Sequence, residues 1–199
     1  ISHDYLIKNS SMWFTCDPWS ERDVYITYNP PAWAFEQLVG ITMCLLTGAE
    51  IYFPEEPETV EENIRETGPQ VLFYSPRLWD SIISTIQAKI YDASAINKFI
   101  YNICLPIGYR MSDFRLESKR PNPFWRFLGS ISYLILFRPL LDKHGLLKLK
   151  HAYQGGASMS PDCFRFLHAI GTDLKQIYGS TEAGFPITSH KDGDINPET

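Results

Sequence analysis

The chain has 199 residues, enough for one domain or slightly more, and 44% of them are hydrophobic. That share is too high for a disordered protein and ordinary for a globular one. The formal net charge of -5 argues against a general nucleic-acid-binding protein. The four cysteines lie far apart and form no C-x-x-C pair, which favours a reducing, cytoplasmic compartment over a zinc site or a disulfide framework.

Hydrophobic spacing and turn residues predict alternating helices and strands over residues 2–90. Val24 to Tyr28 is rich in β-branched and aromatic residues, as strands are. Apolar residues then recur at helical spacing up to Gly48, a residue type that commonly follows a helix end. The predicted elements are helix 2–15, strand 24–28, helix 32–46, strand 49–53, helix 59–67, strand 70–74 and helix 76–90.

The same alternation resumes nearer the C-terminus. We expect a strand at 147–153, a helix at 161–170 that begins after Ser160, and a strand at 173–177. Strands that alternate with helices predict a parallel sheet with crossover helices on its faces. The predicted fold class is therefore α/β, with a largely parallel sheet.

Residues 92–145 interrupt this alternation and are expected to form a helical insertion of two or three helices. Residues 108–150 carry nine Lys or Arg against three Asp or Glu, a local balance of +6 in an acidic chain. The apolar run from Phe127 to Phe137 is only eleven residues long, whereas a bilayer span needs about 20. Two interpretations stay open for residues 119–143: a helix packed on the sheet, or peripheral contact with a membrane surface.

Two glycine-containing turns each follow a predicted strand directly. The first is Gln154-Gly155-Gly156-Ala157-Ser158, and the second runs from Tyr178 to Gly184. Ligands of parallel sheets bind where loops leave the carboxyl ends of strands, and glycine lets the backbone approach a flat ring or a phosphate. The second turn offers an aromatic ring for a base, hydroxyls for phosphate oxygens and a carboxylate for Mg²⁺. Alone, this pattern fits either a nucleotide site or two turns without a ligand.

Tyr178-Gly179-Ser180-Thr181-Glu182 resembles the Tyr-Gly-x-Thr-Glu motif of the adenylate-forming superfamily, which includes acyl-CoA synthetases, firefly luciferases and peptide-synthetase adenylation domains. Gly155-Gly156-Ala157 is similar to the Gly-Gly-Ala segment of that superfamily. Two weaker similarities point to its long-chain fatty acyl-CoA synthetase branch. Pro30 to Gln37 resembles the Leu-Pro-Leu-Ala-His-x-Phe-Glu pattern of this branch, and Ser75 to Trp79 resembles its Val-Pro-Arg-x-Trp segment.

The resemblance implies a nucleotide site at the two turns. Tyr178 would stack on adenine, Thr181 would bond the phosphate, and Glu182 would help to bind Mg²⁺. Thr181 and Glu182 are therefore the catalytic candidates. The residues expected at the nucleotide are Gly155, Gly156, Ala157, Gln176, Ile177, Tyr178, Gly179, Ser180 and Thr181.

The resemblance also implies an acyl channel lined by Trp33, Gly156 and Ile177. Trp33 stands where the family commonly has histidine, and an indole cannot gain a proton as an imidazole can. Ile177 stands where glycine is usual, which bears on the size of the acyl pocket. Both departures keep open a non-catalytic nucleotide- or acyl-binding module.

The function that the resemblance implies is a ligase. It would use ATP to convert a long-chain fatty acid to acyl-AMP, and coenzyme A would then displace AMP. An acyl-AMP ligase that loads a carrier protein is the nearest alternative. We expect residues 1–199 to lie within the large N-terminal AMP-binding domain, with the phosphate loop and the C-terminal domain outside them. The isolated chain is therefore expected to be inactive, and its sequence indicates no oligomeric state.

Overall fold

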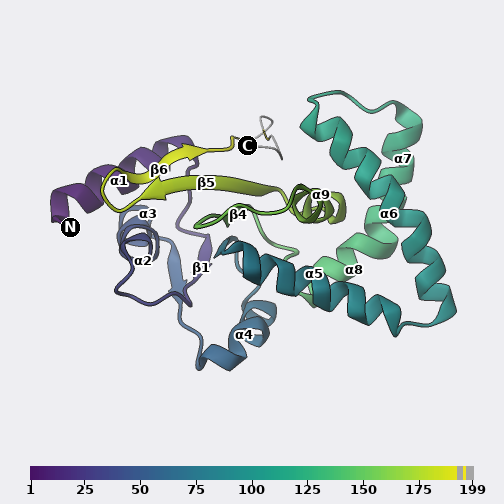
Figure 1. The fold of residues 1–199 in the computed structure, drawn as a ribbon, viewed down its shortest axis with the longest axis horizontal. Helices are drawn as coiled ribbons and strands as arrows, with labels where there is room; N and C mark the ends of the chain where they lie inside the picture. Colours follow the sequence, from purple (N-terminus) through teal and green to yellow (C-terminus); the bar gives the residue numbers. More distant parts are fainter. Residues whose placement is uncertain (192–194, 196–199) are drawn as a thin grey trace.

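The computed structural model describes residues 1–191 and 195, and a six-stranded sheet lies at its centre (Figure 1). The strand order is β2-β1-β3-β4-β5-β6, and all neighbouring pairs are parallel except β5 and β6. The strands are β1 (Val24–Ile26), β2 (Glu50–Tyr52), β3 (Val71–Tyr74), β4 (His151–Gln154), β5 (Leu174–Ser180) and β6 (Gly184–Ser189). The predicted α/β fold with a largely parallel sheet is confirmed.

Helices connect the parallel strands and cover both faces of the sheet. They are α1 (His3–Cys16), α2 (Ala34–Glu36), η1 (Gln37–Met43), α3 (Cys44–Thr47), η2 (Pro57–Thr59), α4 (Val60–Thr67), α5 (Pro76–Tyr91), α6 (Ala95–Leu116), α7 (Pro123–Ser132), η3 (Tyr133–Phe137), α8 (Arg138–Lys143) and α9 (Pro161–Ile170). In Figure 1, α6 and α7 extend away from the sheet beyond α5 and α9, as expected of a helical insertion at 92–145.

Successive residues of the central strand β3 face opposite sides of the sheet. Val71 and Phe73 point into a core formed with α1, α2, η1 and α3. Leu72 and Tyr74 point into a second core beneath α5, α8 and α9. Because both faces are buried, β3 is apolar throughout instead of alternating with polar residues.

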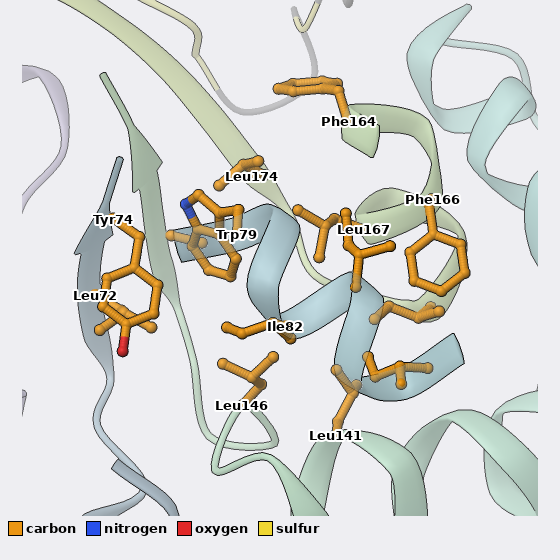
Figure 2. Packing of buried hydrophobic residues seen from close by; sticks show 14 of the residues in the cluster. Leu72, Tyr74, Trp79, Ile82, Leu141, Leu146, Phe164, Phe166, Leu167 and Leu174 are labelled. Carbon is orange, nitrogen blue, oxygen red and sulfur yellow. The ribbon is translucent and has the colours of Figure 1, made fainter. Parts of the chain in front are cut away.

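The second core is the larger one and lies where α5 and α9 cover the sheet (Figure 2). Trp79 of α5 is fully buried, and its indole N–H donates to the backbone carbonyl of Tyr153 at 3.1 Å. Leu167 of α9 and Leu141 of α8 belong to the same core. Through Leu141 this core joins the helical insertion to the sheet.

The strand expected at 147–153 begins later, at His151. Leucines that alternate with lysines favoured a longer strand, but β3 offers no backbone partner before His151. The N–H groups of Lys150 and His151 both donate to the carbonyl of Gln70, at 2.8 and 2.9 Å, so the chain enters the sheet only there.

The strand expected at 173–177 is longer and pairs with a strand that the sequence analysis missed. It continues to Ser180 because β6 pairs with it in antiparallel register. Tyr178 and Gly179 are therefore strand residues, and the expectation of a turn that starts at Tyr178 is wrong. Pro186 concealed β6, but β6 lies at the sheet edge, where proline is tolerated because its missing N–H can face away from the neighbouring strand.

The single helix expected at 32–46 is divided by the π-helical segment η1. The buried side chain of Glu36 folds back against Gly40, where a Cβ would lie 1.9 Å from its carboxylate oxygen. Gly40 therefore makes room for a buried carboxylate within an apolar helix. Short π-helical segments of this kind are frequent at functional sites.

The elements α7, η3 and α8 follow one another without a break and form one helix from Pro123 to Lys143. By length and composition this helix of 21 residues, which contains an 18-residue stretch with a mean hydropathy of 1.2, is sufficient to cross a bilayer, a test that buried core helices also pass. The expectation that this segment is too short rested on the run from Phe127 to Phe137 and is wrong for the whole helix. The first part of the helix packs on α6, and near its end Phe137 and Leu141 enter the core that lies on the sheet.

A buried ion pair joins the end of α1 to the start of β5. Lys175 Nζ donates to Asp17 Oδ2 at 2.6 Å, and both residues are buried. The hydroxyl of Tyr153 donates to the same oxygen at 2.7 Å, and His151 Nδ1 lies 2.9 Å from Asp17 Oδ1. Burial alone would raise the pKa of Asp17, but hydrogen bonds from His151, Lys175 and Tyr153 outweigh it and lower that pKa below its ordinary value.

The other end of α1 contacts the turn between β5 and β6. The hydroxyl of Tyr5 donates to the carbonyl oxygen of Thr181 at 2.7 Å. Asn9 lies against Gly184, where a Cβ would come within 2.1 Å of the amide oxygen of Asn9. Burial, and then the charge of Glu182, raise the pKa of Tyr5 above its ordinary value of 10. Helix α1 therefore links the buried ion pair to the turn that carries Thr181 and Glu182.

Replacing Lys175 with Met should lower the free energy of unfolding by about 3–5 kcal/mol, because Asp17 keeps a buried charge without its cation. The double variant Asp17→Asn/Lys175→Met should recover much of this loss in urea unfolding. Because the folded pKa of Asp17 lies below the unfolded value of about 3.9, its contribution is present above about pH 4 and lost as the pH falls further. A change within about 0.5 kcal/mol in Lys175→Met would contradict this account of the pair.

Replacing Glu182 with Gln should move the pKa of the Tyr5 phenol back towards 10, because the nearby negative charge disfavours the phenolate. Part of the shift should remain, since burial is its larger cause. Titration of ¹³C-labelled tyrosine by NMR measures this pKa, with Glu21→Gln as the control. An unchanged Tyr5 pKa in Glu182→Gln would place the Glu182 carboxylate away from α1.

Candidate functional site

The carboxyl end of β4 forms one side of the candidate site. Gly155 and Gly156 follow the strand directly, ahead of α9. A Cβ at Gly155 would lie 3.0 Å from both the carbonyl oxygen and Cγ1 of Ile177, so glycine allows the two strands' ends to approach closely. Gly156 is exposed with φ of 87°, and nothing lies within 4 Å of where its Cβ would be. Its backbone therefore borders open space that a ligand can occupy. Ala157, the next residue, is exposed as well.

Gln154, the last residue of β4, is a feature of this edge to which the sequence analysis gave no role. Its side chain is fully buried, and neither amide atom has a hydrogen-bond partner among the described residues. An unpaired buried polar group costs about 1–3 kcal/mol, so such groups call for an explanation. The signal available in the sequence was an amide side chain at the end of a strand, next to two glycines.

The end of β5 forms the other side of the site. The ring of Tyr178 is 63% exposed, although its neighbour Ile177 is buried. Phe185 of β6 lies across Gly179, where a Cβ would come within 2.4 Å of the phenylalanine ring. Gly179 thus lets β6 fold closely over β5 while Tyr178 remains accessible.

The hairpin turn that follows β5 presents the polar groups. Thr181 and Glu182 are both exposed there. The Ser180 hydroxyl accepts a hydrogen bond from the backbone N–H of Ala183 at 3.2 Å, which closes the turn. Tyr5 holds the turn from the α1 side through the Thr181 carbonyl, so the Thr181 hydroxyl is not needed to hold it in place.

Parallel pairing of β4 with β5 brings the two sides together. The register aligns Gln154 with Gln176, so the glycines after β4 continue beside Ile177 and Tyr178. The structure thus gathers the nucleotide residues expected from the sequence at the carboxyl edge of the sheet, where ligands of such sheets bind. Their individual roles stay predictions.

Ile177 packs against a group of aromatic rings that the sequence analysis missed. The ring centroid of Phe35 lies 3.8 Å from that of Phe73 and 5.8 Å from that of Phe185. These rings belong to the core that contains Ile177. Phe35 lies within the Pro30 to Gln37 segment and Phe73 in the strand before Ser75, so both were adjacent to recognised patterns.

Trp33 immediately precedes α2 and is 56% exposed. Its backbone N–H donates to the carbonyl of Pro30 at 2.9 Å. Phe35, two residues further on, is the side chain of this segment that packs in the core with Ile177. A place for Trp33 in an acyl channel stays a prediction.

A buried carboxylate, also missed, lies beyond the end of β1. Glu36 accepts hydrogen bonds from the hydroxyl of Tyr25 at 3.0 Å, from the amide of Asn29 at 3.1 Å and from the hydroxyl of Thr27. It borders a cavity of about 240 Å³ that also reaches Phe53. The signal in the sequence was a single acidic residue in an apolar helical pattern. Its neutral donors satisfy the charge without a cation.

The acidic residues present fit Mg²⁺ only if the ion is held mainly by the phosphates of a bound nucleotide. Within the described part of the chain, no three His, Cys, Asp or Glu side chains gather as a metal site. Glu182 is a single exposed carboxylate next to the hydroxyl of Thr181. Mg²⁺ commonly takes one or two carboxylates and completes its shell with waters and substrate phosphates. The turn therefore fits Mg²⁺ that is held mainly by a nucleotide, with Glu182 as its protein ligand.

Comparison with known proteins agrees with this geometry. The family described as AMP-binding enzyme matches residues 1–199. The chain is 22% identical over 172 residues to the long-chain-fatty-acid–CoA ligase ACSBG2 of Rattus norvegicus, which covers 84% of this chain and 25% of the relative. It is 26% identical over 183 residues to fatty acyl-CoA synthetase A of Dictyostelium discoideum, covering 88% and 26%. The chain thus spans about a quarter of the length of the curated relatives it matches.

Among solved structures, the A domain of a carboxylic acid reductase from Segniliparus rugosus, in complex with AMP and a co-purified carboxylic acid, is similar with a TM-score of 0.48 and 22% identity. The similarity covers 84% of this chain and 22% of that one. The family match extends over every residue, and the two glycine segments meet at the carboxyl edge of an α/β sheet. The chain belongs to the AMP-binding enzyme family.

Proposed function

We propose that this chain is part of a ligase that activates a long-chain fatty acid with ATP and transfers the acyl group to coenzyme A. The observation that carries the proposal is the pairing of β4 with β5. This pairing brings Gly155 against Ile177, and the open backbone of Gly156 and the exposed ring of Tyr178 follow directly at the same edge of the sheet. Because the whole chain matches the AMP-binding enzyme family, we expect the ligand at this edge to be ATP or AMP.

The nucleotide base would lie between Gly156 and Tyr178. A tyrosine ring offers a flat apolar face to adenine, and a glycine without a Cβ lets the base approach the backbone. Tyr178 is already exposed, so stacking needs no rearrangement of the core. Ala157, in the segment after β4, and Gln176 of β5 would border the base, and Gly179 and Ser180 would lead from it to the phosphates.

The turn would receive the phosphates. The Thr181 hydroxyl can donate to a phosphate oxygen, and Glu182 would hold the Mg²⁺ that accompanies ATP. Bound Mg²⁺ would supply neutralisation of phosphate charge. The contact from Tyr5 fixes the backbone of the turn, so Thr181 and Glu182 need little reorganisation when the nucleotide binds. The carboxylate of the acid would attack the α-phosphate, forming acyl-AMP and releasing pyrophosphate.

The apolar side of the site favours a hydrophobic acid. Ile177 and Phe73 lie directly beneath Gly155, in a core of aromatic rings. An aliphatic chain gains about 0.8 kcal/mol for each methylene buried against such a surface. The relatives named as fatty acyl-CoA synthetases favour a long-chain acid and coenzyme A as the acceptor.

Replacing Tyr178 with Ala should weaken AMP binding about 5- to 150-fold, because base–aromatic stacking is worth about 1–3 kcal/mol. Tyr178→Phe should keep most of the affinity, since the ring and not the hydroxyl supports the base. Isothermal titration calorimetry with AMP measures both variants. Tyr91→Ala, which removes another exposed tyrosine, is the control and should bind as the original protein does.

The activity itself is tested by pyrophosphate exchange into ATP, using the complete gene product that contains these residues. Exchange that requires Mg²⁺ and a fatty acid, and that rises with chain length, is the expected result. Product analysis with coenzyme A and with a carrier protein separates the two acceptors. Absence of exchange with every acid tested would replace the ligase by a non-catalytic binding module.

A further inference from the structure

The helix from Pro123 to Lys143 carries a row of apolar side chains on the side that faces away from the protein. Phe127 is 64% exposed and Leu134 is 59% exposed. Spacings of three and four residues place such side chains on one face of a helix. We call this the outer face; its members are Phe124, Phe127, Ile131, Leu134 and Ile135.

The opposite side of the same helix contacts α6. Trp125 packs edge-on against Phe114, with ring centroids 6.4 Å apart. A Cβ at Gly129 would lie 3.0 Å from Cγ of Met111, which shows how closely the helices approach. Because these contacts fix the rotation of the helix about its axis, the outer face remains exposed to solvent after folding.

Exposed cations lie along this helix and just before it. Arg120, Arg126 and Arg138 are exposed, and none of them belongs to an ion pair within residues 1–191. They lie in the segment 108–150, whose balance of +6 contrasts with the net charge of -5 for the chain. An exposed apolar row with basic flanks is the composition of helices that lie in the interface of anionic membranes.

We propose that the outer face docks on an anionic lipid surface, with the helix lying parallel to it. Phe127 and Leu134 would enter the boundary between headgroups and acyl chains, and Arg126 and Arg138 would contact the anionic headgroups. A crossing orientation is disfavoured because the inner side packs on α6 and two arginines lie within the 21 residues. A second copy of the chain would bring the +2 of residues 123–143 against the same charge, so charge favours lipid over self-association.

Docking here does not depend on the proposed ligase activity. The outer face belongs to the helical insertion, whereas the nucleotide segments lie at the ends of β4 and β5 (Figure 1). Vesicle binding without pyrophosphate exchange would support the docking proposal and contradict the ligase proposal. Pyrophosphate exchange without vesicle binding would support the ligase proposal and contradict the docking proposal.

Vesicle flotation tests the docking, using phosphatidylcholine alone and phosphatidylcholine with about one third phosphatidylserine. The protein should bind the anionic vesicles, bind the neutral ones weakly, and release on addition of salt. Phe127→Ser/Leu134→Ser should lower binding about 10-fold or more. Arg126→Gln/Arg138→Gln should lower it about 10- to 30-fold on anionic vesicles and hardly at all on neutral ones.

The matched control is Phe53→Ser/Leu45→Ser, which removes a phenylalanine and a leucine that are 71% and 78% exposed away from the insertion. It should leave vesicle binding unchanged, and circular dichroism should show that all three double variants fold.

Four outcomes would overturn the proposal: equal loss in the control, no binding to anionic vesicles, binding that resists alkaline carbonate extraction, or a dimer that Phe127→Ser/Leu134→Ser converts to a monomer. Binding by the 199-residue chain but not by the complete gene product would also overturn it, because the outer face would then be covered by protein.

Discussion

The candidate site depends on one constraint, the parallel register between β4 and β5. Ala152 opposite Leu174 and Gln154 opposite Gln176 set which residues meet beyond the strand ends. Because side chains alternate along a strand, a slip of one residue would turn Tyr178 into the core and Ile177 into solvent. The close approach of Gly155 to Ile177 holds the same register from the ligand side of the sheet.

The buried charges explain how this register is held one residue before the aligned glutamines. Lys175 lies in β5, Tyr153 lies beside it in β4, and both donate to Asp17 of the α1 C-cap. A misregistered strand would leave a buried charge unpaired, which is costly in a low-dielectric interior. Helix α1 then continues along β6 to the turn, where Tyr5 contacts Thr181. One helix thus joins the network that sets the register to the residues proposed to act on phosphate.

Local patterns predicted the parts of the fold that depend on local chemistry. Val71 to Tyr74 and the helix after Ser75 were recognisable because strand composition and a proline at a helix start are sequence-local signals. The start of β4 and the full length of β5 were not, because both are decided by a partner strand. The π-helical segment at Gly40 depends on the side chain of Glu36, which packs against Gly40. The spacing of residues in the sequence does not reveal this contact.

The candidate site, too, was predicted where local sequence determines it and missed where distant residues do. The motif around Tyr178 identified the nucleotide edge, yet its residues lie in a strand and a hairpin turn rather than in one loop. Phe35 and Phe73 were missed because, in a sequence, an aromatic residue that packs beside a site looks like any other aromatic residue of the core. The helical insertion was placed correctly as a unit, but the uninterrupted helix to Lys143 required the structure.

The central claim is that AMP binds between the glycine segment after β4 and the ring at the end of β5. Titration of the ¹⁵N-labelled protein with AMP tests it residue by residue, through the backbone amide shifts. The account predicts the largest shifts at Gly155, Gly156 and Ala157 together with those from Tyr178 to Glu182. Shifts confined to the helical insertion or to the cavity beside Glu36, or no shifts at millimolar AMP, would contradict it.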